Sequence, residues 1–152
     1  ILAVTCKAGQ LSSCKRVTSI FYVSSVRCML GSRPHGLLTQ GERTLECTQA
    51  PVIWIAGGID KGNDYSTLVP LVRDTVKHLI CMGKNNAPLH KAFDELVESS
   101  WDVSSAEEAV AKAYELGQNG DTALLSPACA SFDLFGSYEQ RGRAFKAAVR
   151  QL

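Results

Sequence analysis

The stretch Pro51-Val-Ile-Trp-Ile-Ala56 is followed at once by Gly57-Gly58. It is a continuous apolar run, largely of β-branched residues, without the apolar–polar alternation of a strand that has one wet face. Such a run is typical of a strand buried on both faces of a parallel sheet. The two glycines allow the chain to turn sharply where this strand ends.

Downstream of this strand, helical and strand-like patterns alternate. We expect helices over about 66–76, 88–97, 105–117 and 138–152, and strands over 78–82, 99–103 and 121–125. Ser66 is expected to cap the first helix, and Ser105 with Glu108 has the pattern of a capping box. The alternation predicts an α/β fold, a Rossmann-like and mostly parallel sheet flanked by helices. Right-handed crossovers would bring the carboxyl ends of all these strands to one edge.

Composition excludes several classes of protein. With 152 residues, 45% hydrophobic and 20% charged, the chain is one folded domain rather than a disordered or fibrous segment. Its longest apolar run is too short to cross a bilayer, so we expect no membrane association. Six cysteines without a CxxC pair favour reduced thiols in a cytoplasmic protein, and no metal site is expected. We expect a monomer.

The positive charge of the N-terminal part does not indicate nucleic-acid binding. Residues 1–46 carry six basic and two acidic side chains, but these are scattered, with little aromatic interleaving. This part also lacks a sustained apolar period, and its one strand-like segment is 19–26. The regular pattern begins near residue 47.

Two loops that follow predicted strands carry the candidate chemistry. In Gly57–Tyr65, three glycines let the backbone approach a ligand, and Lys61 is suited to pair with a carboxylate or phosphate. The residues alone leave a solvated surface lysine as an equal alternative, because neither a P-loop nor a GxGxxG motif is present. In Ser126–Ser137, small residues leave backbone amides accessible and Ser131 offers a hydroxyl donor.

Three strings together resemble the C-terminal domain of the Mur ligases, closest to the branch that adds D-glutamate. They are PVIWIAGGIDKGNDY at 51–65, LLSPACASFDLF at 124–135 and YEQRG at 138–142. The resemblance covers residues 47–152. It implies an amino-acid-binding domain of an ATP-dependent ligase that adds D-glutamate to UDP-N-acetylmuramoyl-L-alanine in peptidoglycan synthesis.

The resemblance also implies roles for particular residues. In that family ATP phosphorylates the carboxylate of the UDP-linked substrate, and the amine of the incoming amino acid then attacks the acyl phosphate. Carried over by motif, Lys61 would pair with a carboxylate of D-glutamate. Ser131 and the backbone of Phe132 would hydrogen-bond D-glutamate, and Tyr138 would line its pocket. No catalytic residue is implied, and the intact enzyme would use ATP and Mg²⁺.

The match to the family begins abruptly at Leu45-Glu-Cys47. We therefore expect residues 1–46 to be a poorly matched, frame-shifted or disordered segment, and the sheet of residues 47–152 to be incomplete on its N-terminal side. Without the ATP-binding domain of the family, the chain is expected to be inactive alone. Two alternatives stay open: a non-catalytic small-anion or nucleotide-binding Rossmann-like module, and a remnant without ligand.

Overall fold

The computed structural model describes residues 19–22, 45, 51–60, 62–118, 120–128 and 134–152. Its strands are β1 (Ser19–Tyr22), β2 (Val52–Gly57), β3 (Val76–Met82), β4 (Ser99–Val103) and β5 (Thr122–Ala128). Its helices are α2 (Val69–Thr75), α3 (Ala87–Phe93), α4 (Ala106–Leu116) and α5 (Tyr138–Arg150), with a short 3₁₀ turn η1 (Asp94–Leu96) after α3.

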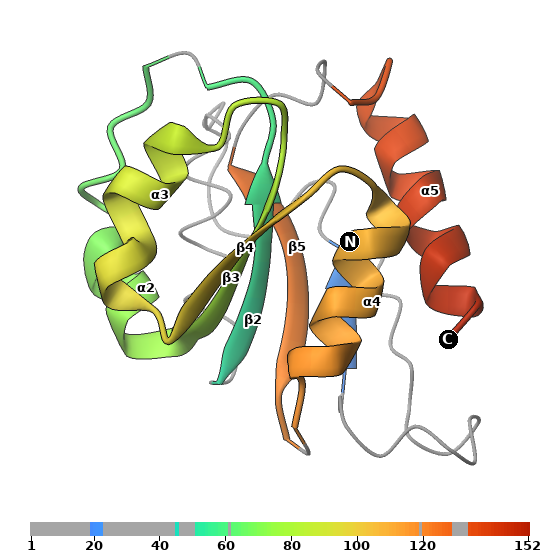
Figure 1. Ribbon diagram of the computed structural model, residues 1–152, viewed down its shortest axis with the longest axis horizontal. Coiled ribbons are helices and arrows are strands. Elements are labelled where there is room, and N and C mark those ends of the chain that lie inside the picture. Colours follow the sequence, from blue (N-terminus) through green and yellow to red (C-terminus); the bar gives the residue numbers. More distant parts are fainter. Residues whose placement is uncertain (1–18, 23–44, 46–50, 61, 119, 129–133) are drawn as a thin grey trace, which may run out of the picture.

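The strands form one sheet in the order β1-β5-β2-β3-β4, and every neighbouring pair is parallel. Helices α2 and α3 cover one face of the sheet and α4 and α5 cover the other (Figure 1). This arrangement confirms the predicted α/β, Rossmann-like fold. From β2 the chain adds β3 and β4 on one side and then β5 on the other, so the direction of winding reverses between β2 and β5.

Strand β2 is the centre of the core. All six residues of β2 are buried, and their side chains alternate between two apolar clusters. Val52, Trp54 and Ala56 pack on the α2–α3 side. Ile53 and Ile55 pack on the α4–α5 side. A continuous apolar run is therefore what a central strand with two covered faces requires.

Two predictions about helix boundaries were wrong. Ser66 does not cap the first helix: α2 begins at Val69 after Leu68, with a proline in its first turn and no side-chain cap. The amide of Ser66 instead donates to Asp64 Oδ1 at 2.9 Å. Val76, which the sequence predicts at the end of this helix, instead opens β3, because its extended backbone pairs with Val52 of β2.

Other boundaries follow the sequence closely. Strand β4 has the predicted bounds, and Ser105 caps α4, its hydroxyl accepting a hydrogen bond from the Glu108 amide at 3.1 Å. The Glu108 carboxylate bonds the amide and hydroxyl of Ser104 rather than the amide of Ser105, so the capping box is shifted by one residue. The helix expected over 88–97 ends sooner, in η1.

The strand expected within residues 19–26 is present over Ser19–Tyr22. It pairs with Thr122–Leu125 of β5 and forms the edge of the sheet. Residues 23–26 lie outside the described part of the chain. One strand of the sheet thus comes from the segment in which the sequence showed no sustained pattern.

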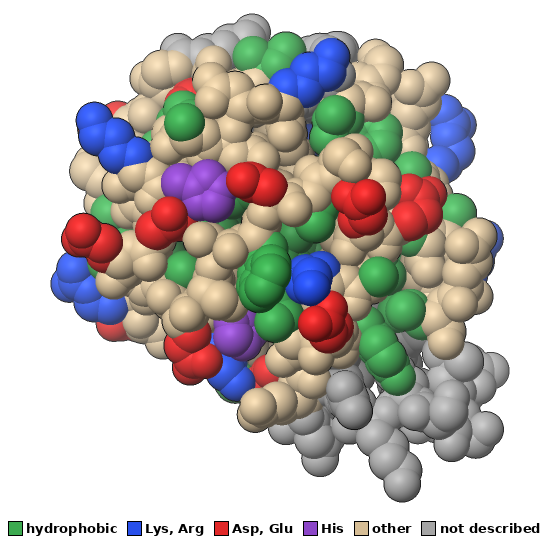
Figure 2. Space-filling view, viewed as in Figure 1, with side chains coloured by type: hydrophobic (Ala, Val, Ile, Leu, Met, Phe, Trp, Pro, Cys, Tyr) green, Lys and Arg blue, Asp and Glu red, His purple; other side chains and the backbone are tan. Residues whose placement is uncertain are grey.

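On the face shown in Figure 2, acidic and basic side chains are interspersed rather than gathered by sign. On the edge strand β4, Trp101 is 42% exposed and the Lys112 ammonium lies 4.4 Å from the centroid of its ring. Within the described residues, no helix is both long enough and apolar enough to pass through a membrane.

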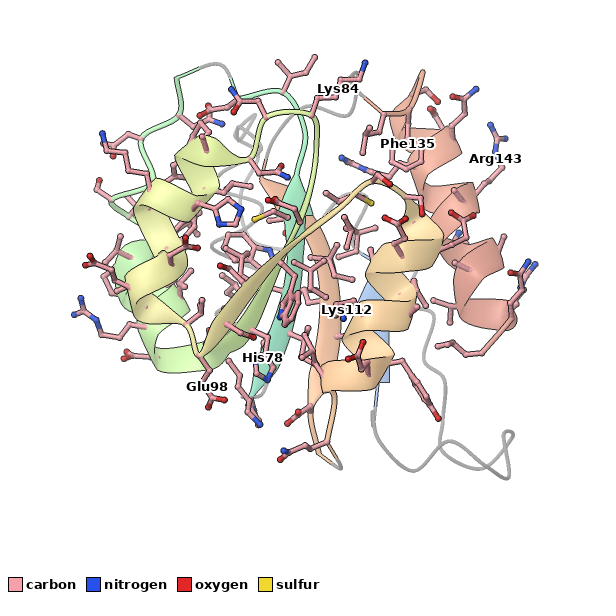
Figure 3. All side chains as sticks on the ribbon, in the orientation of Figure 1. His78, Lys84, Glu98, Lys112, Phe135 and Arg143 are labelled. Carbon is pink, nitrogen blue, oxygen red and sulfur yellow. The ribbon has the colours of Figure 1, made fainter. Side chains whose placement is uncertain are left out.

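His78 gives the fold a pH dependence. It lies near the start of β3, at the end of the sheet opposite Lys84 and Phe135 (Figure 3). It is buried, with Nδ1 2.9 Å from Ser99 Oγ. Burial lowers the pKa of His78 below its usual 6.5; Glu98 and Asp121 act in the opposite direction, and Lys77 lowers it further.

We expect the free energy of unfolding to fall as the solution is acidified from pH 7.5 to pH 5. In the unfolded chain His78 is protonated near pH 6.5, whereas in the folded chain it is protonated only at lower pH. The neutral side chain therefore contributes stability above pH 6.5, and this contribution is lost as the pH falls through the pKa of the folded state. Urea unfolding of the wild type and of His78→Gln at both pH values measures this. An equal loss in the two proteins would contradict the assignment to His78.

Candidate functional site

The two loops singled out in the sequence start side by side. Strands β2 and β5 are parallel neighbours, and Gly57 at the end of β2 pairs with Ala128 at the end of β5. Both loops therefore leave the same edge of the sheet, at the place where the winding direction reverses. In open α/β sheets, ligands bind in the crevice outside the strand ends at such a point.

The first loop is held by its own carboxylates. Asp60 Oδ1 accepts hydrogen bonds from the amides of Gly62 and Asn63, both at 2.9 Å. These bonds hold the backbone at Gly62 and Asn63. Hydrogen bonds from the backbone and side chain of Ser66 lower the pKa of Asp64, so this carboxylate stays ionised.

The end of the first loop is anchored in the core. Tyr65 is 7% exposed and its ring packs edge-to-face on Phe93, with centroids 5.5 Å apart. Phe93 packs in the same way on Trp54 of β2, at 5.4 Å. The Trp54 indole in turn donates a 2.8 Å hydrogen bond to the backbone oxygen of Ser126 on β5. One chain of contacts thus links the end of the first loop to the strand that begins the second.

The second loop is anchored where it returns to α5. Leu134 and Phe135 pack against the α4–α5 side of the core. Ser137 caps α5, its hydroxyl accepting a hydrogen bond from the Gln140 amide at 3.2 Å, while Gln140 Oε1 accepts one from the Gly136 amide at 2.8 Å. The described ends of both loops are thus held by contacts with the core or by hydrogen bonds.

The predicted binding residues themselves stay untested. Lys61, Ser131 and Phe132 lie outside the described residues. Tyr138 is the first residue of α5, but its side chain is not among those described. The structure therefore describes the frame of the predicted site, and the roles of these four residues stay predictions.

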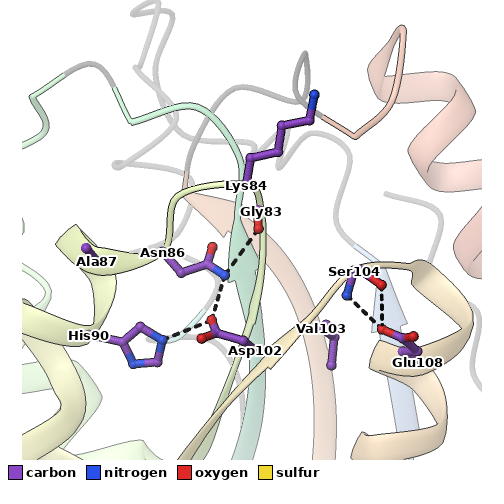
Figure 4. A pocket seen from close by; sticks show the side chains of 9 residues that line it. All are labelled: Gly83, Lys84, Asn86, Ala87, His90, Asp102, Val103, Ser104 and Glu108. Carbon is purple, nitrogen blue, oxygen red and sulfur yellow. Dashed lines mark hydrogen bonds and ion pairs between the residues drawn. The ribbon is translucent and has the colours of Figure 1, made fainter.

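A polar pocket opens at the same edge of the sheet, beyond β3. Its volume is about 550 Å³, and it is lined by Gly83, Lys84, Asn86, Ala87, His90, Asp102, Val103, Ser104 and Glu108 (Figure 4). Asp102 is the centre of its hydrogen bonding. Asp102 Oδ1 accepts a bond from Asn86 Nδ2 at 2.6 Å and lies 3.0 Å from His90 Nε2.

His90 faces carboxylates on both sides of its ring. Nδ1 lies 2.9 Å from Asp94 Oδ1, and Nε2 faces Asp102. The hydrogen bond with Asp102 is the main cause that raises the pKa of His90. Partial burial of the ring lowers this pKa, and the hydrogen bond with Asp94 raises it further. The same contact with His90, followed by the bond from Asn86, lowers the pKa of Asp102.

Sequence reasoning missed this second group of residues. His90 and Asp102 lie within the helix expected over 88–97 and the strand expected over 99–103, and neither was predicted to be a site residue. The pair lies 12 positions apart and meets because β3 and β4 are parallel neighbours with α3 packed beside them. The available signal was that Asn86 and Asp102 both lie at the carboxyl ends of predicted strands.

Comparison with known proteins gives relatives for most of the chain. A protein named UDP-N-acetylmuramoylalanine–D-glutamate ligase from Christiangramia forsetii is 52% identical over 108 residues, or 71% of this chain. Proteins of the same name from Porphyromonas gingivalis and Caldicellulosiruptor bescii are 50% and 42% identical over 108 and 112 residues. The chain spans about 24% of the length of these relatives. No protein-family model matches it.

Proposed function

We propose that residues 47–152 form the amino-acid-binding domain of a D-glutamate-adding ligase of the Mur ligase family, because 71% of the chain is 50–52% identical to proteins named as that ligase. The observation that carries the proposal is the pairing of Gly57 with Ala128, since it starts both motif-bearing loops at one point of the sheet edge. The substrate would be D-glutamate, joined to UDP-N-acetylmuramoyl-L-alanine in cytoplasmic peptidoglycan synthesis.

The chemistry of the loops suits a ligand with two carboxylates. The Lys61 ammonium would pair with one carboxylate, and the Ser131 hydroxyl and the Phe132 amide would donate hydrogen bonds to the ligand. Charge-assisted bonds of this kind are among the strongest available to a protein. Tyr138, at the start of α5, would line the pocket. These residues bind and orient the amino acid so that its amine meets the activated carboxylate.

ATP and Mg²⁺ belong, in this proposal, to the intact ligase, where they would activate the carboxylate of the UDP-linked substrate. Among the described residues of this chain, the one group of three candidate metal ligands does not suit Mg²⁺, because it contains a thiol and an imidazole whereas Mg²⁺ prefers oxygen ligands. We therefore expect this chain alone to bind the amino acid but not to form the amide bond.

Lys61→Ala is expected to weaken D-glutamate binding by about 1.5–3 kcal/mol, the scale of a hydrogen bond to a charged group. Ser131→Ala should cost less, about 1 kcal/mol, since its hydroxyl is a neutral donor. Lys77→Ala is the matched control, because Lys77 lies near the start of β3, at the opposite end of the sheet. Calorimetric or NMR titration with D-glutamate measures all three.

L-Glutamate and ADP complete the experiment. Binding of D-glutamate in preference to L-glutamate, lost in Lys61→Ala and kept in Lys77→Ala, supports the proposal. Equal affinity of wild type and Lys61→Ala for D-glutamate would contradict the role of Lys61. If ADP shifted the NMR signals of Gly57–Asp60 and D-glutamate did not, the protein would instead be a nucleotide-binding module.

A further inference from the structure

The fold gathers three metal-ligating side chains beside the polar pocket, and two of them, His90 and Asp102, line it. Cys81 of β3, His90 of α3 and Asp102 of β4 have ligand atoms that all lie within 4.8 Å of one another. Cys81 and Asp102 are directly paired across β3 and β4, so their side chains leave the same face of the sheet. Residues 9 and 12 positions apart thus form one cluster of a sulfur, a nitrogen and an oxygen.

The residues around this cluster are arranged as they are around known metal-binding histidines. Asp94 Oδ1 lies 2.9 Å from His90 Nδ1 and orients the ring so that Nε2 faces Asp102. A ligating histidine usually has its second ring nitrogen bonded to a carboxylate in this way. Asn86 Nδ2 holds the other carboxylate, Asp102, at 2.6 Å, and also donates to the backbone oxygen of Cys81 at 3.3 Å.

The cluster is open on one side. Cys81 is buried, His90 is half-buried, and the Asp102 side chain is 64% exposed. His90 and Asp102 face the pocket of about 550 Å³, which gives an ion a path of entry and leaves room for a water ligand (Figure 4). Three protein ligands with one open position are typical of exchangeable or catalytic zinc sites.

We propose that Cys81, His90 and Asp102 bind a Zn²⁺ ion, with a water molecule from the pocket as fourth ligand. A thiolate together with an imidazole selects zinc over Mg²⁺ or Ca²⁺, which prefer oxygen. Zinc–ligand bonds of 2.0–2.3 Å bring tetrahedral ligand atoms to about 3.5 Å from one another. The cluster therefore needs to contract by only about 1 Å.

Binding of Zn²⁺ would replace existing contacts of the Cys81, His90 and Asp102 side chains. The Cys81 thiol gives up its proton, and His90 Nε2 exchanges its hydrogen bond with Asp102 for a bond to the ion, while Asp94 keeps its bond to Nδ1. The protons go to solvent, so affinity rises with pH. The ion would tie β3, β4 and α3 together beside the carboxyl edge of the sheet. This site is independent of the proposed amino-acid site.

The test is a titration of the reduced, chelator-treated full chain with Zn²⁺ and with Co²⁺. We expect one equivalent of tightly bound metal and, with Co²⁺, a thiolate-to-metal charge-transfer band and the intense visible bands of a tetrahedral site. Cys81→Ser, His90→Gln and Asp102→Asn should each abolish tight binding. Asp94→Asn should weaken it about 10–100-fold, as for other residues that orient a ligand.

Two controls separate this site from the other metal-binding groups of the chain. His78→Gln removes a histidine at the far end of β3 and should leave affinity unchanged. Replacing the other five cysteines by serine should also leave it unchanged. Circular dichroism checks that each variant folds. If Cys81→Ser does not fold, the test of the zinc site rests on Asp102→Asn, because the Asp102 side chain is exposed and its substitution should leave the fold intact. Metal binding that survives Asp102→Asn and His90→Gln, or no binding to the wild type, overturns the proposal.

Discussion

Gly57→Ala is expected to lower the free energy of unfolding by about 2–6 kcal/mol, the sum of backbone strain and overpacking. Gly57 ends β2 with φ = +132°, a conformation that L side chains rarely adopt. A Cβ there would press on the carbonyl oxygen of Met82, 2.7 Å from its carbonyl carbon and 2.8 Å from its amide nitrogen. These are backbone atoms of a central strand, so they cannot turn away as a side chain would.

Gly120→Ala separates the two causes. Gly120 also has a positive φ, +104°, but among the described atoms none lies within 4 Å of a Cβ built on it. Its substitution should cost about 1–3 kcal/mol, from strain alone. Urea unfolding followed by circular dichroism measures both variants. If Gly57→Ala and Gly120→Ala lost the same free energy of unfolding, the close approach of Gly57 to the backbone of Met82 would contribute nothing to the cost of Gly57→Ala.

Phe93→Ala is expected to cost about 3–5 kcal/mol of unfolding free energy, the usual range for removing a fully buried aromatic ring. Phe93 has no exposed surface and makes edge-to-face contacts with both Trp54 and Tyr65. Such ring pairs add to the burial of area. The neighbouring rings are themselves held, Trp54 by its hydrogen bond to Ser126, so the cavity closes only in part.

Phe135→Ala is the matched control, since it makes the same change at a half-buried position. Its loss should be clearly smaller than that of Phe93→Ala, because part of the ring is already in water. Thermal and urea unfolding measure the difference. Hydrogen exchange at the Gly62 and Asn63 amides adds a local readout, which should quicken in Phe93→Ala as Tyr65 loses its support. A Phe93→Ala protein as stable as Phe135→Ala would contradict the role given to this ring.

Helix boundaries mark the limit of local reasoning. Ser105 could be identified as a cap from four adjacent residues, because capping is a contact within one turn. Ser66 has the same chemistry but is engaged by Asp64, and α2 starts later. Val76 suits a helix face or a strand equally well by its apolar side chain. Only pairing with Val52 on β2 decided for the strand.

The fold class and the position of the central strand could both be predicted from the sequence alone. Both follow from periodicity and apolar runs, which are properties of adjacent residues. Three short strings, at 51–65, 124–135 and 138–142, carried the resemblance to the Mur ligases. Tertiary structure alone decided that Gly57 meets Ala128, that Tyr65 is anchored on Phe93, and that Cys81, His90 and Asp102 converge. The physical reason is that these contacts depend on the order in which strands pair and on which helix covers which face. Strand order and helix placement minimise the free energy of the whole chain, and no local pattern encodes them.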